Sequence, residues 1–202
     1  MPILKQNESS FEPVPEGAHV ARCYGMISLG TQPSNNPKFK PSFKVVLQFE
    51  LPGEIIVING EKKPMMTSHF LTAYLGSVNK PSKTNLFLTA WRGRSFTEKE
   101  LAGFDLATVV GAPCLLNIIH ETRDGKTRER IASVSPLPKG TKAPPQINPS
   151  VRYEIEQGRD KTFSVLPEWM RKMIEQCEEW THPAAAEEPD PEPAPEDEEV
   201  PF

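Results

Sequence analysis

Hydrophobic and polar side chains alternate most regularly between residues 43 and 51, where every odd position is apolar. A period of two predicts a β-strand that buries one face and exposes the other. Pro52 and Gly53 should then bend or bulge this strand, because proline cannot donate to a sheet ladder and glycine weakens it. An earlier strand is predicted over residues 17–29, and the turn-forming residues 30–38 predict a loop between the two strands.

A hairpin is predicted where the apolar residues 55–58 meet Asn59 and Gly60. This pair is favoured in two-residue hairpin turns because both residues tolerate positive φ. The return strand should run from about residue 65 to 75. The first third of the chain therefore predicts three sequential antiparallel strands.

Two short helices are predicted next. Ser82 can cap the first helix and Gly93 can end it, because glycine accepts the left-handed conformation that follows many helices. Thr97 and Glu100 have the spacing of a capping box at the start of the second helix, which Gly103 can end.

Two further strands, residues 114–120 and 128–134, flank Asp124 and Gly125, which again favour a hairpin turn. The order of three strands, helices and two strands is that of an OB-fold, a five-stranded Greek-key barrel with a helix between strands three and four. We therefore predict a mainly β protein with an OB-fold nucleic-acid-binding domain over residues 17–136. The alternative is another small β-barrel or a β-sandwich.

The two ends of the chain differ from this domain. Residues 137–180 should wrap the barrel irregularly and end in one C-terminal amphipathic helix of about three to four turns, with apolar side chains at helical spacing from Pro167 to Trp180. This helix should pack on the barrel or on a second subunit, which leaves a homodimer open. Residues 1–16 are predicted to be flexible, and residues 181–202 to form a disordered acidic tail that binds partners.

The formal net charge of −4 hides two oppositely charged parts. The tail holds eight acids and no Lys or Arg, which leaves 19 acids against 23 bases, or +4, in the first 180 residues. Such asymmetry indicates nucleic-acid contact together with an interaction tail. The 22 prolines, about twice the usual share of ~5%, argue against a helical bundle or a doubly wound sheet.

Catalytic motifs are missing from the sequence: it has no glycine-rich phosphate loop, G-x-S-x-G, H-E-x-x-H or C-x-x-C. His19 and Cys23 would lie about 13 Å apart along a strand, too far to share a metal ion. We therefore expect no enzyme, no metal site and no cofactor. No apolar run reaches ~18 residues, so no membrane helix is expected. Three well-separated cysteines indicate a reducing cytoplasm without disulfides.

Basic and aromatic residues are interleaved near the expected ligand face of the OB-fold, which comprises the middle strands and the first and fourth loops. Single-stranded nucleic acid needs cations along its phosphates and flat rings for its bases to stack on. Phe39 and Tyr74 are the predicted rings, whereas Trp91 shares helical spacing with Phe87 and is expected in the core. Any single lysine could belong to an ordinary solvated surface, so the prediction rests on the cluster as a whole. The predicted DNA-binding residues are Lys38, Phe39, Lys40, Lys44, Tyr74, Lys80, Lys83, Arg92, Arg94, Arg128 and Arg130.

The last residues join an acidic run to an apolar tip. A ring can fill an apolar pocket while the acids steer it to a basic rim. This tip resembles that of the bacterial single-stranded DNA-binding proteins. The resemblance implies docking of replication, repair and recombination proteins through Asp197, Glu198, Glu199, Val200, Pro201 and Phe202.

The body of the chain, from about residue 13 to 148, is similar to a group of bacteriophage single-stranded DNA-binding proteins with an OB-fold. The similarity is most specific in the Ala-Trp-Arg-Gly-Arg sequence of residues 90–94, with further similarity in residues 15–24 and 111–114. It implies sequence-independent coating of single-stranded DNA during phage replication or recombination, in the cytoplasm of an infected bacterium. The extra C-terminal helix and the short Pro/Glu-rich tail depart from the bacterial proteins, so a homotetramer is not implied.

Three other functions are compatible with parts of this pattern. A recombination protein that anneals strands would differ in activity more than in sequence. An interaction adaptor would use only the tail. A metal-dependent nuclease would need an acidic cluster that the folded part of the sequence does not predict.

Overall fold

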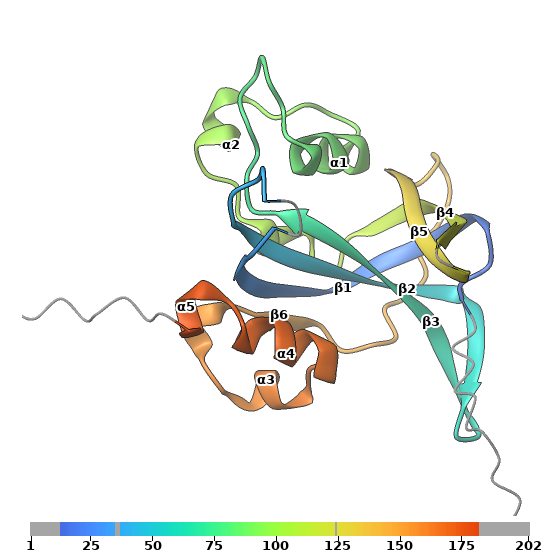
Figure 1. The fold of residues 1–202 in the computed structure, drawn as a ribbon. Coiled ribbons are helices and arrows are strands. Elements are labelled where there is room, and N and C mark those ends of the chain that lie inside the picture. The colour runs from blue at the N-terminus through green and yellow to red at the C-terminus, as the bar shows by residue number, and fades with distance from the viewer. Residues whose placement is uncertain (1–12, 35–36, 124, 182–202) are drawn as a thin grey trace, which may run out of the picture.

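Five antiparallel strands curl into a half-barrel in the computed structural model, which describes residues 13–34, 37–123 and 125–181 (Figure 1). These strands are β1 (Gly17–Gln32), β2 (Ser42–Ile58), β3 (Glu61–Thr72), β4 (Pro113–Arg123) and β5 (Lys126–Ser135). Their spatial order is β3-β2-β1-β4-β5, so β1 lies in the centre. A sixth strand, β6 (Val151–Tyr153), pairs in parallel with residues 25–27 of β1. The prediction of a mainly β protein is confirmed.

The β2–β3 hairpin has the predicted two-residue turn. Asn59 and Gly60 adopt φ values of 53° and 83°, and both positive values suit this tight turn. The predicted interruption of β2 is a register shift between Leu51 and Ile55. The second predicted turn includes Asp124, which lies outside the described residues.

Helices connect β3 to β4, as predicted. They are α1 (Lys83–Arg92), α2 (Glu98–Ala102) and the 3₁₀-helix η1 (Leu106–Val109). The Ser82 side chain accepts a hydrogen bond from a backbone N–H of the first turn of α1, and Gly93 follows that helix with φ 68°. Thr97 and Glu100 form the predicted capping box at the start of α2. Local capping chemistry therefore sets the bounds of both helices.

The sheet does not close into the five-stranded barrel that we predicted. Among the described residues, β3 and β5 share no ladder, and α1 contacts both strands across the gap. The α1 helix lies at the gap between β3 and β5 because its Leu88 and Trp91 side chains fill the inside of the half-barrel. The Trp91 ring centroid lies 5.4 Å from that of Phe49, and its Nε1 donates to the Pro113 carbonyl at 2.9 Å. Trp91 is a core residue, as predicted.

The outer face of the sheet is covered by the C-terminal part of the chain, below the sheet in Figure 1. After β6 this part forms η2 (Ile155–Gln157), α3 (Lys161–Val165), α4 (Glu168–Glu175) and α5 (Glu178–Thr181). Ile27, Leu29 and Val46 of the sheet pack there against apolar residues of β6 and the helices. The molecule therefore has two cores, one on each face of the same sheet.

Residues 137–180 differ from the prediction in two ways. They contain β6 and α3 where we predicted an irregular wrap, and the single predicted helix is broken between α4 and α5. At the break, Cys177 packs so closely on Gly30 that a Cβ at position 30 would lie 2.6 Å from the Cys177 Cβ. The Glu179 carboxylate then accepts hydrogen bonds from the Thr31 backbone N–H at 2.8 Å and from its hydroxyl at 2.7 Å. Contacts with the end of β1 explain where the helix breaks.

Two polar side chains of the sheet hold residues 144–148, the segment that leads to the C-terminal layer on the outer face. The completely buried Glu50 carboxylate accepts hydrogen bonds from the backbone N–H groups of Ile147 and Asn148, both at 2.7 Å, and from the Asn148 amide at 2.8 Å. The Arg22 guanidinium donates to the Pro144 carbonyl at 2.7 and 3.1 Å. These contacts hold residues 144–148 against β1 and β2.

Cys23, Cys114 and Cys177 are buried free thiols. Burial raises the pKa of the Cys23 thiol to about 12, so this thiol remains protonated at neutral pH.

Within the described part of the chain, no helix has both the length and the apolar character needed to cross a membrane.

Replacing Glu50 with alanine should lower the free energy of unfolding by about 3 kcal/mol, because two buried backbone N–H groups lose their charged acceptor. Urea titration at neutral pH measures this change. The matched control is Glu54→Ala in the same strand, which removes a partly exposed contact with His19 and should cost less than about 1 kcal/mol. Equal losses in the two variants would contradict the proposed role of Glu50.

Candidate nucleic-acid interface

Two neighbouring hollows share the side chain of Lys44. The first, about 530 Å³, lies at the β1–β2 connection and is lined by Phe39, Lys40 and Lys44 together with small polar and proline residues. The second, about 650 Å³, lies where β3, the start of α1 and β5 meet, with Tyr74 and Lys83 among its lining residues. We call the two hollows together the basic groove.

Three cations of the basic groove come from three different elements, and the fourth, Lys40, lies in the β1–β2 connection. Lys44 near the start of β2 pairs in register with Thr72 of β3, and its Nζ donates to the Thr72 hydroxyl at 2.8 Å. Lys83 is the exposed first residue of α1. Arg130 of β5 forms an ion pair with Glu121 at 2.6 Å, with both side chains about half exposed. Exposed pairs contribute only ~0–1 kcal/mol, so a phosphate can take the place of the Glu121 carboxylate.

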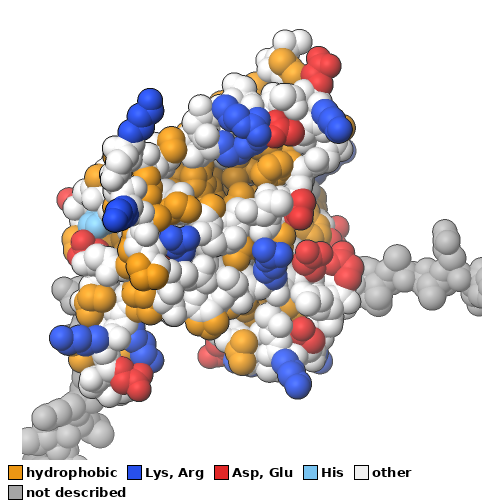
Figure 2. Space-filling view, turned by 180° about the vertical axis from the view of Figure 1, so that it is seen from behind, with side chains coloured by type: hydrophobic (Ala, Val, Ile, Leu, Met, Phe, Trp, Pro, Cys, Tyr) orange, Lys and Arg blue, Asp and Glu red, His pale blue; other side chains and the backbone are white. Residues whose placement is uncertain are grey.

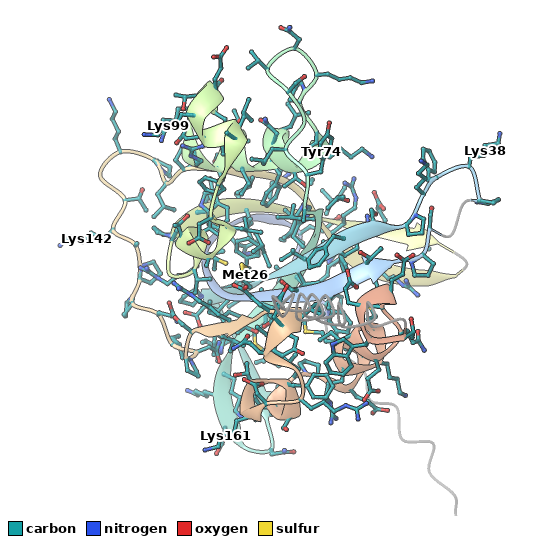
Figure 3. The ribbon with its side chains drawn as sticks, turned by 90° about the vertical axis from the view of Figure 1, so that its left-hand side faces the viewer. Met26, Lys38, Tyr74, Lys99, Lys142 and Lys161 are labelled. Carbon is teal, nitrogen blue, oxygen red and sulfur yellow. The ribbon has the colours of Figure 1, made fainter. Side chains whose placement is uncertain are left out.

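Both predicted stacking rings are exposed at this surface. Tyr74 has 65% of its surface exposed and lines the second hollow, and Phe39 has 68% exposed and lines the first. Single exposed apolar side chains are common on protein surfaces, so the two rings are candidates because they lie beside the cations of the basic groove. Figure 3 shows Tyr74 and Lys38 on the upper part of the molecule, away from Lys161 at the bottom.

The second hollow contains a stacked ring pair that the sequence analysis missed. The rings of His69 in β3 and Phe87 in α1 lie 4.1 Å apart with an interplanar angle of 14°. Burial, and to a smaller extent the charge of Arg130, lower the pKa of His69 to about 4. The imidazole is therefore neutral at pH 7 and adds a flat, uncharged surface beside the cations. No local pattern in the sequence links His69 with Phe87, because the two rings come from different elements.

The predicted DNA-binding residues divide into three groups. Lys44, Tyr74, Lys83 and Arg130 line one hollow, and Phe39 and Lys40 line the adjoining one. Lys38, Lys80 and Arg128 are exposed on the connecting loops or on β5 and line neither hollow. The remaining two, Arg92 and Arg94, form ion pairs with a carboxylate of α2, with the Arg92 side chain 15% exposed and the Arg94 side chain 58% exposed.

Arg92 and Arg94 both bind the Glu100 carboxylate. Arg94 Nη2 lies 2.8 Å from Glu100 Oε1, and Arg92 contacts the same oxygen while its guanidinium lies 4.2 Å from the Phe96 ring centroid. The hydrogen bond from Arg94 is the largest contribution that holds the pKa of Glu100 well below its usual range. This network fastens α2 to the end of α1, and a contact of either arginine with DNA stays a prediction.

The face behind the view of Figure 1 carries basic and acidic side chains side by side around an apolar hollow (Figure 2).

Among the described residues, no three His, Cys, Asp or Glu side chains are grouped so that they could hold a metal ion. The predicted partner-binding residues of the tail, Asp197 to Phe202, lie outside the described residues.

A scan of the chain against models of protein families finds no match, and a search of curated proteins finds no relative. The function must therefore be argued from the chemistry of the site.

Acid should destabilise the protein through His69. Its pKa is depressed in the folded state, so its contribution to stability is complete above the ordinary pKa of about 6.5 and is lost as pH falls towards 4. Between pH 7 and 5 the free energy of unfolding should fall by about 2 kcal/mol more in the wild type than in His69→Gln. Urea titrations of both proteins at the two pH values measure this difference. The same fall in both would show that His69 is not the titrating group.

Proposed function

We propose that this protein binds single-stranded DNA without sequence preference and coats it during the replication or recombination of bacteriophage DNA in an infected bacterium. The observation that carries the proposal is the basic groove, where Lys44 joins two hollows that together hold four cations and exposed rings. Cations along a groove bind phosphates of any sequence, and rings stack on any base. The phage setting rests on the resemblance of residues 13–148 alone.

The strand arrangement supports an OB-fold assignment. The order β3-β2-β1-β4-β5, with α1 between β3 and β4 in the chain, is the order of an OB-fold whose third and fifth strands remain unpaired. In that fold, ligands bind to the middle strands and to the first and fourth loops. The basic groove includes the connection that corresponds to the first loop, together with residues of β2 and β3.

A protein contact made by the folded domain, in addition to the tail that the adaptor alternative uses, is supported by a different observation. Ile55, Val57 and Met66 project from the β2–β3 hairpin with 50%, 62% and 42% of their surfaces exposed. Exposed apolar side chains of this kind are typical of protein contacts, and a second copy of the chain could use them. An adaptor would leave oligo-dT unshifted in a gel, whereas a strand-annealing protein would also accelerate the pairing of complementary strands.

Binding of oligo-dT should weaken with salt, with log K falling by ~0.7 for each phosphate neutralised. The double variant Lys44→Ala/Lys83→Ala should reduce this slope by about 1.4, because two phosphate contacts are lost. Fluorescence anisotropy between about 50 and 200 mM salt measures both slopes.

The matched control is Lys142→Ala/Lys161→Ala, which removes the same charge from positions away from the groove (Figure 3). This control should keep the wild-type slope. Binding that does not depend on salt would overturn the assignment to DNA, and equal effects of the two double variants would overturn the location.

The acidic tail is proposed to dock replication, repair and recombination proteins, and to compete with DNA for the basic groove. Its eight acids oppose a body of charge +4. A chain that ends at Trp180 should therefore bind oligo-dT more tightly than the full chain at low salt, and this gain should shrink as salt screens the attraction. Anisotropy titrations at two salt concentrations test this.

Removal of Val200, Pro201 and Phe202 alone serves as the control, because it keeps every acidic side chain and should leave DNA binding unchanged. Unchanged or weaker binding by the chain that ends at Trp180 would contradict the competition.

A further inference from the structure

A third hollow, of about 470 Å³, lies on the other side of Tyr74 from the basic groove. Tyr74 and Thr84 line both spaces, so they form the wall between them. Figure 3 looks onto this side of the molecule, with Met26 at the centre and Tyr74 above it. We call this hollow the acid-rimmed pocket, because Asp105 and Glu154 are its charged lining residues.

The walls of the acid-rimmed pocket are mostly apolar and come from four parts of the fold. Met26 of β1, Val45 of β2 and Leu88 of α1 meet Phe104, which precedes η1. The volume falls within the ~300–1,000 Å³ that is usual for small-molecule sites. An apolar space with few polar groups accommodates a flat ring better than a hydrated ion.

Asp105 is held in place by the start of η1. Its Oδ1 accepts a hydrogen bond from the Ala107 backbone N–H at 2.8 Å, and its carbonyl accepts from the Thr108 hydroxyl at 2.7 Å. No described residue donates a hydrogen bond to the second carboxylate oxygen, Oδ2, so this oxygen can accept one from a ligand. No Lys or Arg side chain is among the described residues that line this pocket.

The charges of the two spaces select different parts of a nucleotide. Phosphates are attracted by Lys44, Lys83 and Arg130 in the basic groove, whereas the carboxylates of Asp105 and Glu154 repel them. A carboxylate accepts a hydrogen bond from the exocyclic amino group of cytosine, as it does in the reading of base edges in duplex DNA. Thymine has no exocyclic amino group, and its single N3–H donor lies between two carbonyl oxygens, which a carboxylate repels.

We propose that the acid-rimmed pocket receives one base of the strand that lies in the basic groove. The base passes Tyr74, its ring contacts Met26 and Phe104, and its amino group donates to Asp105. The pocket therefore favours amino-bearing bases over thymine at one position of an otherwise sequence-independent site. This inference rests on the proposed function, because it needs a strand in the groove.

The test compares oligo-dT and oligo-dC of equal length by fluorescence anisotropy. The quantity of interest is the ratio of Kd for oligo-dT to Kd for oligo-dC, and it should fall about fivefold in Asp105→Asn relative to the wild type. The asparagine amide can present either a donor or an acceptor, so it no longer rejects thymine. Asparagine also caps helices well, and thermal unfolding checks that the fold is kept.

Two further variants make the outcome specific. Glu98→Gln removes one negative charge from α2 outside the pocket and should leave the ratio unchanged. Ala73→Phe places a ring at an exposed position of the pocket lining and should lower the ratio as Asp105→Asn does, because it blocks entry. An unchanged ratio in Asp105→Asn and Ala73→Phe, with oligonucleotides still bound, would overturn the pocket alone. No binding of either oligonucleotide by the wild type would overturn the proposed function.

Discussion

The double-sided burial of the central strands is the constraint on which the rest of this structure depends. Residues 26–29 of β1 and 45–51 of β2 are buried almost without interruption, so both faces of the sheet need a covering layer. The α1 helix covers one face, and β6 with α3 and α4 covers the other. The outer layer begins with residues 144–148, which have few apolar contacts of their own. The buried Glu50 carboxylate holds this segment by accepting hydrogen bonds from its backbone N–H groups.

The same constraint creates the candidate site. The α1 helix fills the half-barrel from the side where β3 and β5 would otherwise pair, so an open gap remains between these strands. Lys44, Tyr74 and Arg130 are far apart in the sequence, and the gap brings them to one surface. A closed barrel would have placed ladder hydrogen bonds where the basic groove now lies. The candidate site is therefore a consequence of how the inner core is filled.

Features set by a few neighbouring residues could be predicted from the sequence, and features set by tertiary contacts could not. The turn at Asn59 and Gly60 and the cap at Ser82 follow from local backbone preferences, and the structure has both. The unpaired gap and the break before α5 depend on packing against distant strands. In the site, the exposed Tyr74 was predicted as a ring among basic residues. The stack of His69 on Phe87 was not, because neither residue has a local signal for the other.

The two spaces beside Tyr74 carry charges of opposite sign, and in the proposed complex this difference would separate the phosphates of a strand from its bases. The basic groove attracts phosphates, and the neighbouring carboxylates exclude them, so a strand in the groove can turn only its bases towards the acid-rimmed pocket. The acidic tail follows the same rule. In the proposed competition, its eight acids are attracted to the cations of the basic groove and repelled by Asp105 and Glu154, so the tail would take the phosphate positions and not the base position. The proposed competition and the proposed base preference therefore depend on different residues and can be changed independently.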